Sequence, residues 1–169
     1  TVRQALADIE AELDVIVEDI NVDLQDMIDT TVEYADKPAF DAIDEVYSAL
    51  DAAELVYLND RANEENVETV RQALADIEAE LDALVEDINV DLQDMIDTTV
   101  EYADKPAFDA IDEAYVALSP MEKEYVDEFA TEENIETVRD ALAAIEAELD
   151  ALVEDINVDL QEMIDNGVT

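Results

Sequence analysis

The residues best suited to chemistry in this sequence are aspartates and an asparagine spaced two apart, as in calcium-binding loops. The stretch DINVDLQDMIDT begins at Asp19 and recurs at Asp87; a near copy, DINVDLQEMIDN, begins at Asp155. An EF-hand loop needs Gly at its sixth position and a bidentate Glu at its twelfth. The first copy has Leu24 and Thr30 at these positions. The sequence therefore argues against an EF-hand.

The same stretch fits a helix, in which its polar side chains diverge. Ile20 and Leu24 continue a helical apolar seam. Residues two apart point to different sides of a helix, so Asp19, Asn21 and Asp23 cannot all face one ion. We predict no metal-ligating, cofactor-binding or catalytic residue and no cofactor. Weak, non-specific binding of divalent cations to the acidic faces is the expectation from charge alone.

Catalytic groups other than carboxylates are scarce. The chain has no Cys, no His and a single Gly, which removes the cysteine nucleophile and the commonest general base. Paired carboxylates would need distinct environments within a cleft, and an evenly charged repeat offers no unique pair. We interpret the chain as not an enzyme.

The charge is strongly one-sided, with 50 acidic and 7 basic residues and a net charge of −43. Such a surface repels nucleic acid and anionic membranes, and no apolar run is long enough for membrane insertion. The charge also opposes folding, and salt screens it. A salty habitat, an acidic surface with a role, and simple solubility all fit this composition.

The sequence repeats itself with a period of 68 residues, since TVRQALADIEAELD at Thr1 returns at Thr69 and, slightly changed, at Thr137. Residues 1–45 and 69–113 differ at two positions. Such self-similarity indicates units that lean on their neighbours. The repeats are 1–68, 69–136 and a partial third, 137–169. Because the chain begins and ends inside its own repeat, we expect a fragment of a longer protein.

Each repeat carries one long helix, predicted from about Glu64 to Tyr102 in the second copy. Its apolar residues are spaced as a heptad seam until Ile88, and Leu92 follows after a second four-residue step. We interpret that step as a stutter that slightly unwinds a supercoil. Asn63 and Thr131 are the expected N-caps of successive long helices.

Two short helices should follow each long one. Asp104 is the expected N-cap of the first, with Pro106 in its first turn. SPME at 119–122 is a capping box for the second, and DAAE at 51–54 has the same role in the first repeat. The expected apolar stripe of the second short helix is Met121, Tyr125, Val126 and Phe129.

These elements predict an all-α fold of tandem three-helix-bundle-like modules joined by long shared helices, a spectrin-like rod. The modules would span about 17–82 and 84–150 and share the helix 64–102. If the second short helix instead forms a full fourth antiparallel helix, the assembly could fold compactly. The aromatic residues expected in the core of the second module are Tyr102, Phe108, Tyr115, Tyr125 and Phe129.

The stretch DKPAFDAIDEAYVALSPMEKEYVDEF, followed by IETVRDALAAIEAEL, resembles a helical repeat of large cell-surface proteins of Gram-positive bacteria. The shared features are an Asp-Lys start, a helix ending Tyr-x-Ala-Leu, and then Ser/Thr-x-x-Glu/Gln-Lys-x-x-Val. The resemblance covers most of residues 100–150, and residues 32–82 more weakly because DAAELVYLND lacks the Glu-Lys pair. It implies a non-catalytic spacer in an extracellular, cell-wall-attached or secreted protein.

Three functions remain open at this level. The favoured one is a structural stalk or spacer that holds another domain away from a cell surface. The second is an adhesin-like binding module, in which helical bundles engage an unknown protein partner multivalently. The third is an acidic scaffold that collects calcium.

Overall fold

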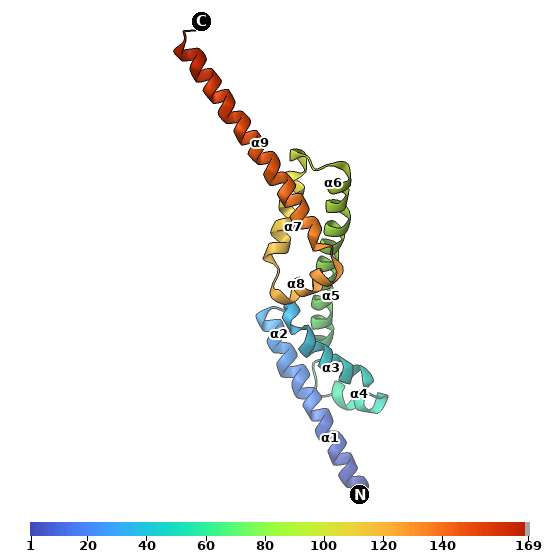
Figure 1. Cartoon of the computed structure of the whole chain (residues 1–169). Helices are drawn as coiled ribbons and strands as arrows, with labels where there is room; N and C mark the ends of the chain where they lie inside the picture. Colours follow the sequence, from blue (N-terminus) through green and yellow to red (C-terminus); the bar gives the residue numbers. More distant parts are fainter. Residues whose placement is uncertain (168–169) are drawn as a thin grey trace. The chain divides into compact units, whose positions relative to one another are not determined.

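The computed structural model describes residues 1–167, and these residues are helical apart from short connections. The prediction of an all-α fold is confirmed. The chain divides into two compact units, Thr1–Leu81 (unit 1) and Asp82–Thr169 (unit 2). Figure 1 labels the helices of both units.

Unit 1 starts with a long helical segment that is followed by two short helices. The segment changes its winding once, in a π-helical turn, and a 3-10 turn leads into the short helices. In chain order the elements are α1 (Val2–Glu18), the π turn η1 (Asp19–Asp23), α2 (Leu24–Thr30), the 3-10 turn η2 (Tyr34–Asp36), α3 (Lys37–Ala49), α4 (Ala52–Asn59) and the start of α5 (Glu64–Glu86).

Unit 2 repeats this order, and α5 begins in unit 1 and ends in unit 2. The remaining elements are the π turn η3 (Asp87–Asp91), α6 (Leu92–Thr98), the 3-10 turn η4 (Tyr102–Asp104), α7 (Lys105–Ala117), α8 (Pro120–Phe129) and α9 (Glu132–Asp165).

The short helices begin where their capping residues predict. The Ser119 hydroxyl accepts from the Glu122 N–H, and the Glu122 carboxylate accepts from the Ser119 N–H. Asp51 and Glu54 form the same reciprocal pair in unit 1. Each box satisfies two backbone donors that a helix start leaves without a partner. Thr131 holds the N-cap position of α9, but its side chain makes no capping bond.

The long helix of the second copy ends at Thr98, so the predicted end at Tyr102 is wrong. Thr99 has a φ of +83°, outside the helical region. The Thr98 hydroxyl donates back to the Asp94 carbonyl oxygen, as serines and threonines in helices can. A new cap then starts at Glu101, whose N–H donates to the Asp104 carboxylate at 2.8 Å.

The core of unit 1 lies between the long helical segment, the short pair and the start of α5. It is built from residues of every one of these elements, so no helix of the unit stands apart. Its buried members are Leu13, Ile16, Ile20, Leu24, Phe40, Leu58, Val67, Val70 and Leu74.

The aromatic core expected for unit 2 is correct in part. Phe108 and Tyr115 are buried, but Tyr102 and Phe129 are about half exposed, at 51% and 54%. Tyr125 is partly buried and packs against Phe129 with their ring centroids 5.1 Å apart. The buried residues of α7 and α8 are Phe108, Ile111, Tyr115 and Val126, so the core of unit 2 uses aliphatic as well as aromatic side chains.

No helix within residues 1–167 is long and apolar enough to cross a membrane.

Candidate functional site

The most unusual backbone feature of each unit is its π turn. In unit 2 the N–H of Leu92 donates to the Asp87 carbonyl oxygen, five residues back. An α-helix would join it to Ile88, four residues back. The wider turn therefore releases the Ile88 carbonyl oxygen from that donor. π turns are rare and occur frequently at functional sites, so this one calls for a physical explanation.

A buried asparagine supplies the replacement donor. The side-chain amide of Asn134, near the start of α9, donates to the Ile88 carbonyl oxygen at 3.0 Å. Asn66 donates to the Ile20 carbonyl oxygen at the same distance in unit 1. Both asparagines are almost fully buried, at 6% and 4% exposure. A buried amide without partners is strongly unfavourable, so turn and asparagine depend on each other.

A second asparagine lies inside the π turn, and its side chain bonds the backbone just before the next long helix. The Asn89 amide donates to the Phe129 carbonyl oxygen at 2.9 Å and accepts from the Thr131 N–H at 2.8 Å. Asn21 makes the equivalent bonds to Arg61 and Asn63 in unit 1. We call each pair, Asn21 with Asn66 and Asn89 with Asn134, an asparagine clamp. The clamp joins the π turn to the start of the next long helix.

The π turn also explains the four-residue steps of the apolar seam. Ile88 and Leu92 are both fully buried although they follow Leu84 in two successive steps of four. An α-helix rotates such residues progressively off one face, whereas a π turn holds more residues and keeps them aligned. The interpretation of a stutter that unwinds a supercoil is corrected: the extra residue is absorbed locally.

The residues first considered as calcium ligands lie within this helical turn. Asp19 and Asp23 are its first and last residues, and Asn21 belongs to the clamp. Partial burial raises the pKa of Asp19, and the charges of Asp23 and Glu18 raise it further. Across residues 1–167, no group of three or more acidic side chains is arranged to hold a metal ion.

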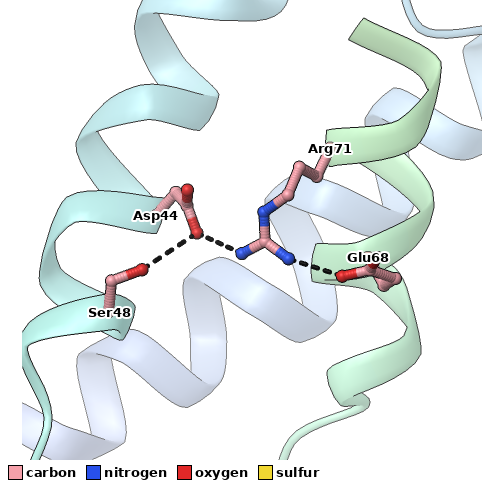
Figure 2. A network of polar contacts seen from close by, with 4 residues as sticks. All are labelled: Asp44, Ser48, Glu68 and Arg71. Carbon is pink, nitrogen blue, oxygen red and sulfur yellow. Dashed lines mark hydrogen bonds and ion pairs between the residues drawn. The ribbon is translucent and has the colours of Figure 1, made fainter. Parts of the chain in front are cut away.

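Four of the seven basic residues join the first short helix of a unit to the following long helix. Arg71 on α5 pairs with Asp44 on α3 and with Glu68 on its own helix, and Ser48 donates to the same aspartate (Figure 2). Arg139 pairs with Asp112 at the same place in unit 2. Such partly exposed pairs each contribute about 0–1 kcal/mol, so they select helix neighbours more than they stabilise the fold.

Two lysines make the same kind of connection. Lys37 on α3 lies 3.1 Å from Glu78 on α5, and Lys105 on α7 lies 3.3 Å from Glu146 on α9. Partial burial alone would lower the pKa of Lys37, but hydrogen bonds to Glu78 and Asp41 raise it above its ordinary value. The same positions therefore carry the same helix-to-helix contact in both units.

Tyrosine hydroxyls tie the second short helix to the long one. Tyr57 donates to Asp14 at 2.7 Å, and Tyr125 donates to Asp82 at 2.6 Å. In unit 2 a further tyrosine, Tyr115, donates to Asp127. Burial raises the pKa of Tyr115, and so does this bond to a carboxylate.

Unit 1 carries an apolar groove of about 490 Å³ between α1, α3 and the start of α4. Its lining also includes the acidic residues Glu12, Asp19 and Glu54. Val15 and Ile16, the two residues that distinguish residues 1–45 from 69–113, both line it. The apolar lining residues are Ile9, Leu13, Val15, Ile16, Ala42, Ile43, Val46 and Leu50.

These arrangements join helices: the hydroxyl–carboxylate bonds of the tyrosines connect neighbouring helices, and the Ser48–Asp44 bond connects successive turns of α3. The clamp was missed because Asn21 was considered only as a possible calcium ligand, together with Asp19 and Asp23. A usable signal was present in the two repeats: an asparagine follows the first two glutamates of α5 and α9, at Asn66 and Asn134, one residue before an apolar position.

Comparison of the chain with protein-family models, with curated proteins and with solved structures gives no match.

Proposed function

We propose that this chain is a non-catalytic structural stalk, a spacer segment of an extracellular surface protein. The observation that carries the proposal is the helical run through α5, η3 and α6, which starts in unit 1 at Glu64 and ends in unit 2 at Thr98. A helix that belongs to both units would fix the orientation of the second unit relative to the first, as in a rod of three-helix-bundle-like modules.

Two further features support a spacer. The contacts that build each unit, the clamp, the ion pairs and the tyrosine–aspartate bonds, recur at equivalent positions in the next unit. A protein segment whose role is to span a distance can be lengthened by adding equivalent units, so repetition of this kind is what a spacer needs. The placement on a cell surface or cell wall rests on the resemblance of residues 100–150 to surface-protein repeats.

Small-angle X-ray scattering of chains with two, three and four full repeats tests the proposal. The maximum dimension should increase by a constant increment with each repeat. A particle that stays compact as repeats are added would remove the basis for a stalk.

A matched pair of proline substitutions tests the shared helix directly. Ala79 and Ala147 are exposed and both lie within the sequence IEAEL. Proline inside a helix removes a hydrogen bond and kinks the helix, at about 3 kcal/mol or more. Ala79→Pro in α5 should change the angle between units and shorten the maximum dimension. Ala147→Pro lies in α9 of unit 2 and should leave the angle between the units unchanged.

The groove in unit 1 favours a second candidate, a binding module for a protein partner. Its lining, mostly apolar with three acidic residues, is complementary to an amphipathic helix rich in Lys or Arg. Fluorescence anisotropy with a labelled lysine-rich amphipathic peptide would measure binding at 150 mM salt, about the physiological ionic strength. Val46→Glu inside the groove should abolish binding, whereas Val116→Glu outside it should not. Equal binding by both variants would show non-specific charge attraction.

A further inference from the structure

The last part of α9 carries an apolar face that its own unit leaves uncovered. Leu152, Ile156 and Leu160 are exposed by 54%, 48% and 51%. Their counterparts one repeat earlier, Leu84, Ile88 and Leu92, are at most 7% exposed. In Figure 1 the red end of α9 extends beyond helices α6, α7 and α8 of unit 2.

The uncovered copy also differs in its winding. Residues 155–159 have the sequence DINVD, identical to 19–23 and 87–91. The two covered copies are π turns, and the third is part of the continuous α-helix α9. Identical sequences therefore take two backbone conformations, and the difference between them is what lies against them.

The repeats themselves identify what covers this face. The segment from Glu101 to Leu142 follows the second copy and contributes the buried residues of the short helices and of the next long helix. It also supplies Asn134 and the backbone groups that Asn89 binds. The corresponding segment does the same for the first copy. A partner with the apolar pattern and the asparagine of 101–142 would meet the exposed face as that segment meets Leu84, Ile88 and Leu92 in unit 2.

We infer that residues 149–165 of α9 form a docking face for a further copy of the helical segment 98–149, and that docking converts Asp155–Asp159 from an α to a π turn. The incoming asparagine would donate to the Ile156 carbonyl oxygen. That carbonyl would exchange the Leu160 N–H for the side-chain amide, and the Leu160 N–H would shift to the Asp155 carbonyl oxygen. The Asp159 N–H, which holds the Asp155 carbonyl oxygen in the α-helix, would shift in turn to the Glu154 carbonyl oxygen, five residues back. Every backbone N–H in the turn then keeps an acceptor, and the Ile156 carbonyl keeps a donor in the incoming asparagine.

This inference stands apart from the stalk function, since a compact assembly would cover the same face. The test uses the chain extended after Asp165 by a second copy of residues 98–149. Hydrogen-bond scalar couplings in NMR would identify the acceptor of the Leu160 N–H, and hydrogen exchange would report on 149–165. We expect the acceptor to change from Ile156 to Asp155 and exchange to slow by about tenfold or more.

A matched variant separates docking from the change in winding. The substitution Asn134→Ala, made in the appended copy alone, keeps the apolar contacts and removes the donor to Ile156. It should preserve slow exchange while the Leu160 N–H remains bonded to Ile156. Unchanged exchange in the extended chain would overturn the docking face. A π turn that persists in the variant would overturn the role of the asparagine.

Discussion

Residues 86–97 and 154–165 are two helical stretches of nearly identical sequence in different surroundings. The sequences EDINVDLQDMID and EDINVDLQEMID differ by one methylene, at Asp94 and Glu162. The earlier stretch is packed in unit 2 and contains a π turn, whereas the later one is exposed and α-helical. The comparison teaches that local preference here favours an ordinary helix and that tertiary contacts impose the wider turn.

The contacts that impose it are polar as well as apolar. Burying Ile88 and Leu92 on one face favours a turn with more residues, and the Asn134 amide satisfies the carbonyl that the turn releases. Apolar burial without the asparagine would leave a buried carbonyl unsatisfied, at a cost of about 1–3 kcal/mol. The apolar contacts and the asparagine are therefore both needed. Three of the following predictions therefore pair a covered residue with its uncovered counterpart.

The largest difference in stability between a covered and an uncovered position should come from the leucine that follows the π turn. Leu92→Ala removes a fully buried side chain and should lower the free energy of unfolding by about 3 kcal/mol, measured by urea denaturation. Leu160→Ala makes the same change at a half-exposed position and should alter it by less than about 0.5 kcal/mol. Similar losses at both sites would mean that the face of α9 is already covered in solution.

The clamp asparagine should come next. Asn89→Ala removes the bonds to Phe129 and Thr131 and should destabilise unit 2 by about 1–2 kcal/mol. Asn157→Ala, at the exposed counterpart, should be close to neutral or slightly stabilising because alanine is the better helix former. The measurement is the same urea series, and equal effects would contradict the clamp.

A substitution at Thr99 should increase stability, in contrast to the two preceding ones. Its φ of +83° is strained for a β-branched residue, and the third copy has Gly167 at this position with a φ of +70°. Thr99→Gly should stabilise unit 2 by about 0.5–1 kcal/mol, because relief of about 1–2 kcal/mol exceeds the entropic cost of glycine. Thr98→Gly, inside the helix, should destabilise instead. Loss of stability from both would show that the Thr99 conformation is unstrained.

A smaller effect concerns the acidic residue that opens the turn. Burial raises the pKa of Asp87 above its ordinary value of 3.8, and Asp91 and Glu86 raise it further. The folded state therefore binds this proton at a pH where the unfolded state has released it, and stability falls as the pH rises through the raised pKa. Asp87→Asn should stabilise the protein at neutral pH by about 0.2–0.5 kcal/mol.

The control for this prediction is Asp155→Asn in the exposed copy. The difference between the two variants, followed by thermal melting from pH 7 down to pH 4, should shrink as Asp87 becomes protonated. A difference that grows on acidification would reverse the assigned sign.

The smallest effect should be that of calcium. The net charge of −43 predicts that added salt raises the melting temperature by screening repulsion. Calcium and magnesium, compared at constant ionic strength, should then give equal melting temperatures. A shift specific to calcium would favour the acidic scaffold over the stalk.

Much of the secondary structure could be predicted because its signals are local. The capping boxes at Asp51 and Ser119 start their helices at the expected residues, since such caps act within one turn. The end of the long helix was misplaced because no Gly or Pro marks it; a threonine takes the positive φ instead. The exposure of Tyr102 and Phe129 was also missed, because burial depends on which helices lie above each ring.

Helicity and the starts of the short helices could be predicted because caps and apolar spacing involve neighbouring residues, and the repeat could be read directly by comparing stretches of the sequence 68 residues apart. Tertiary structure alone decided the winding of DINVD, which is a π turn at Asp19 and Asp87 and an α-helix at Asp155. The physical reason is that the carbonyl released by the wider turn needs a donor about 46 residues further along the chain. No local pattern in five identical residues can specify whether that donor is present.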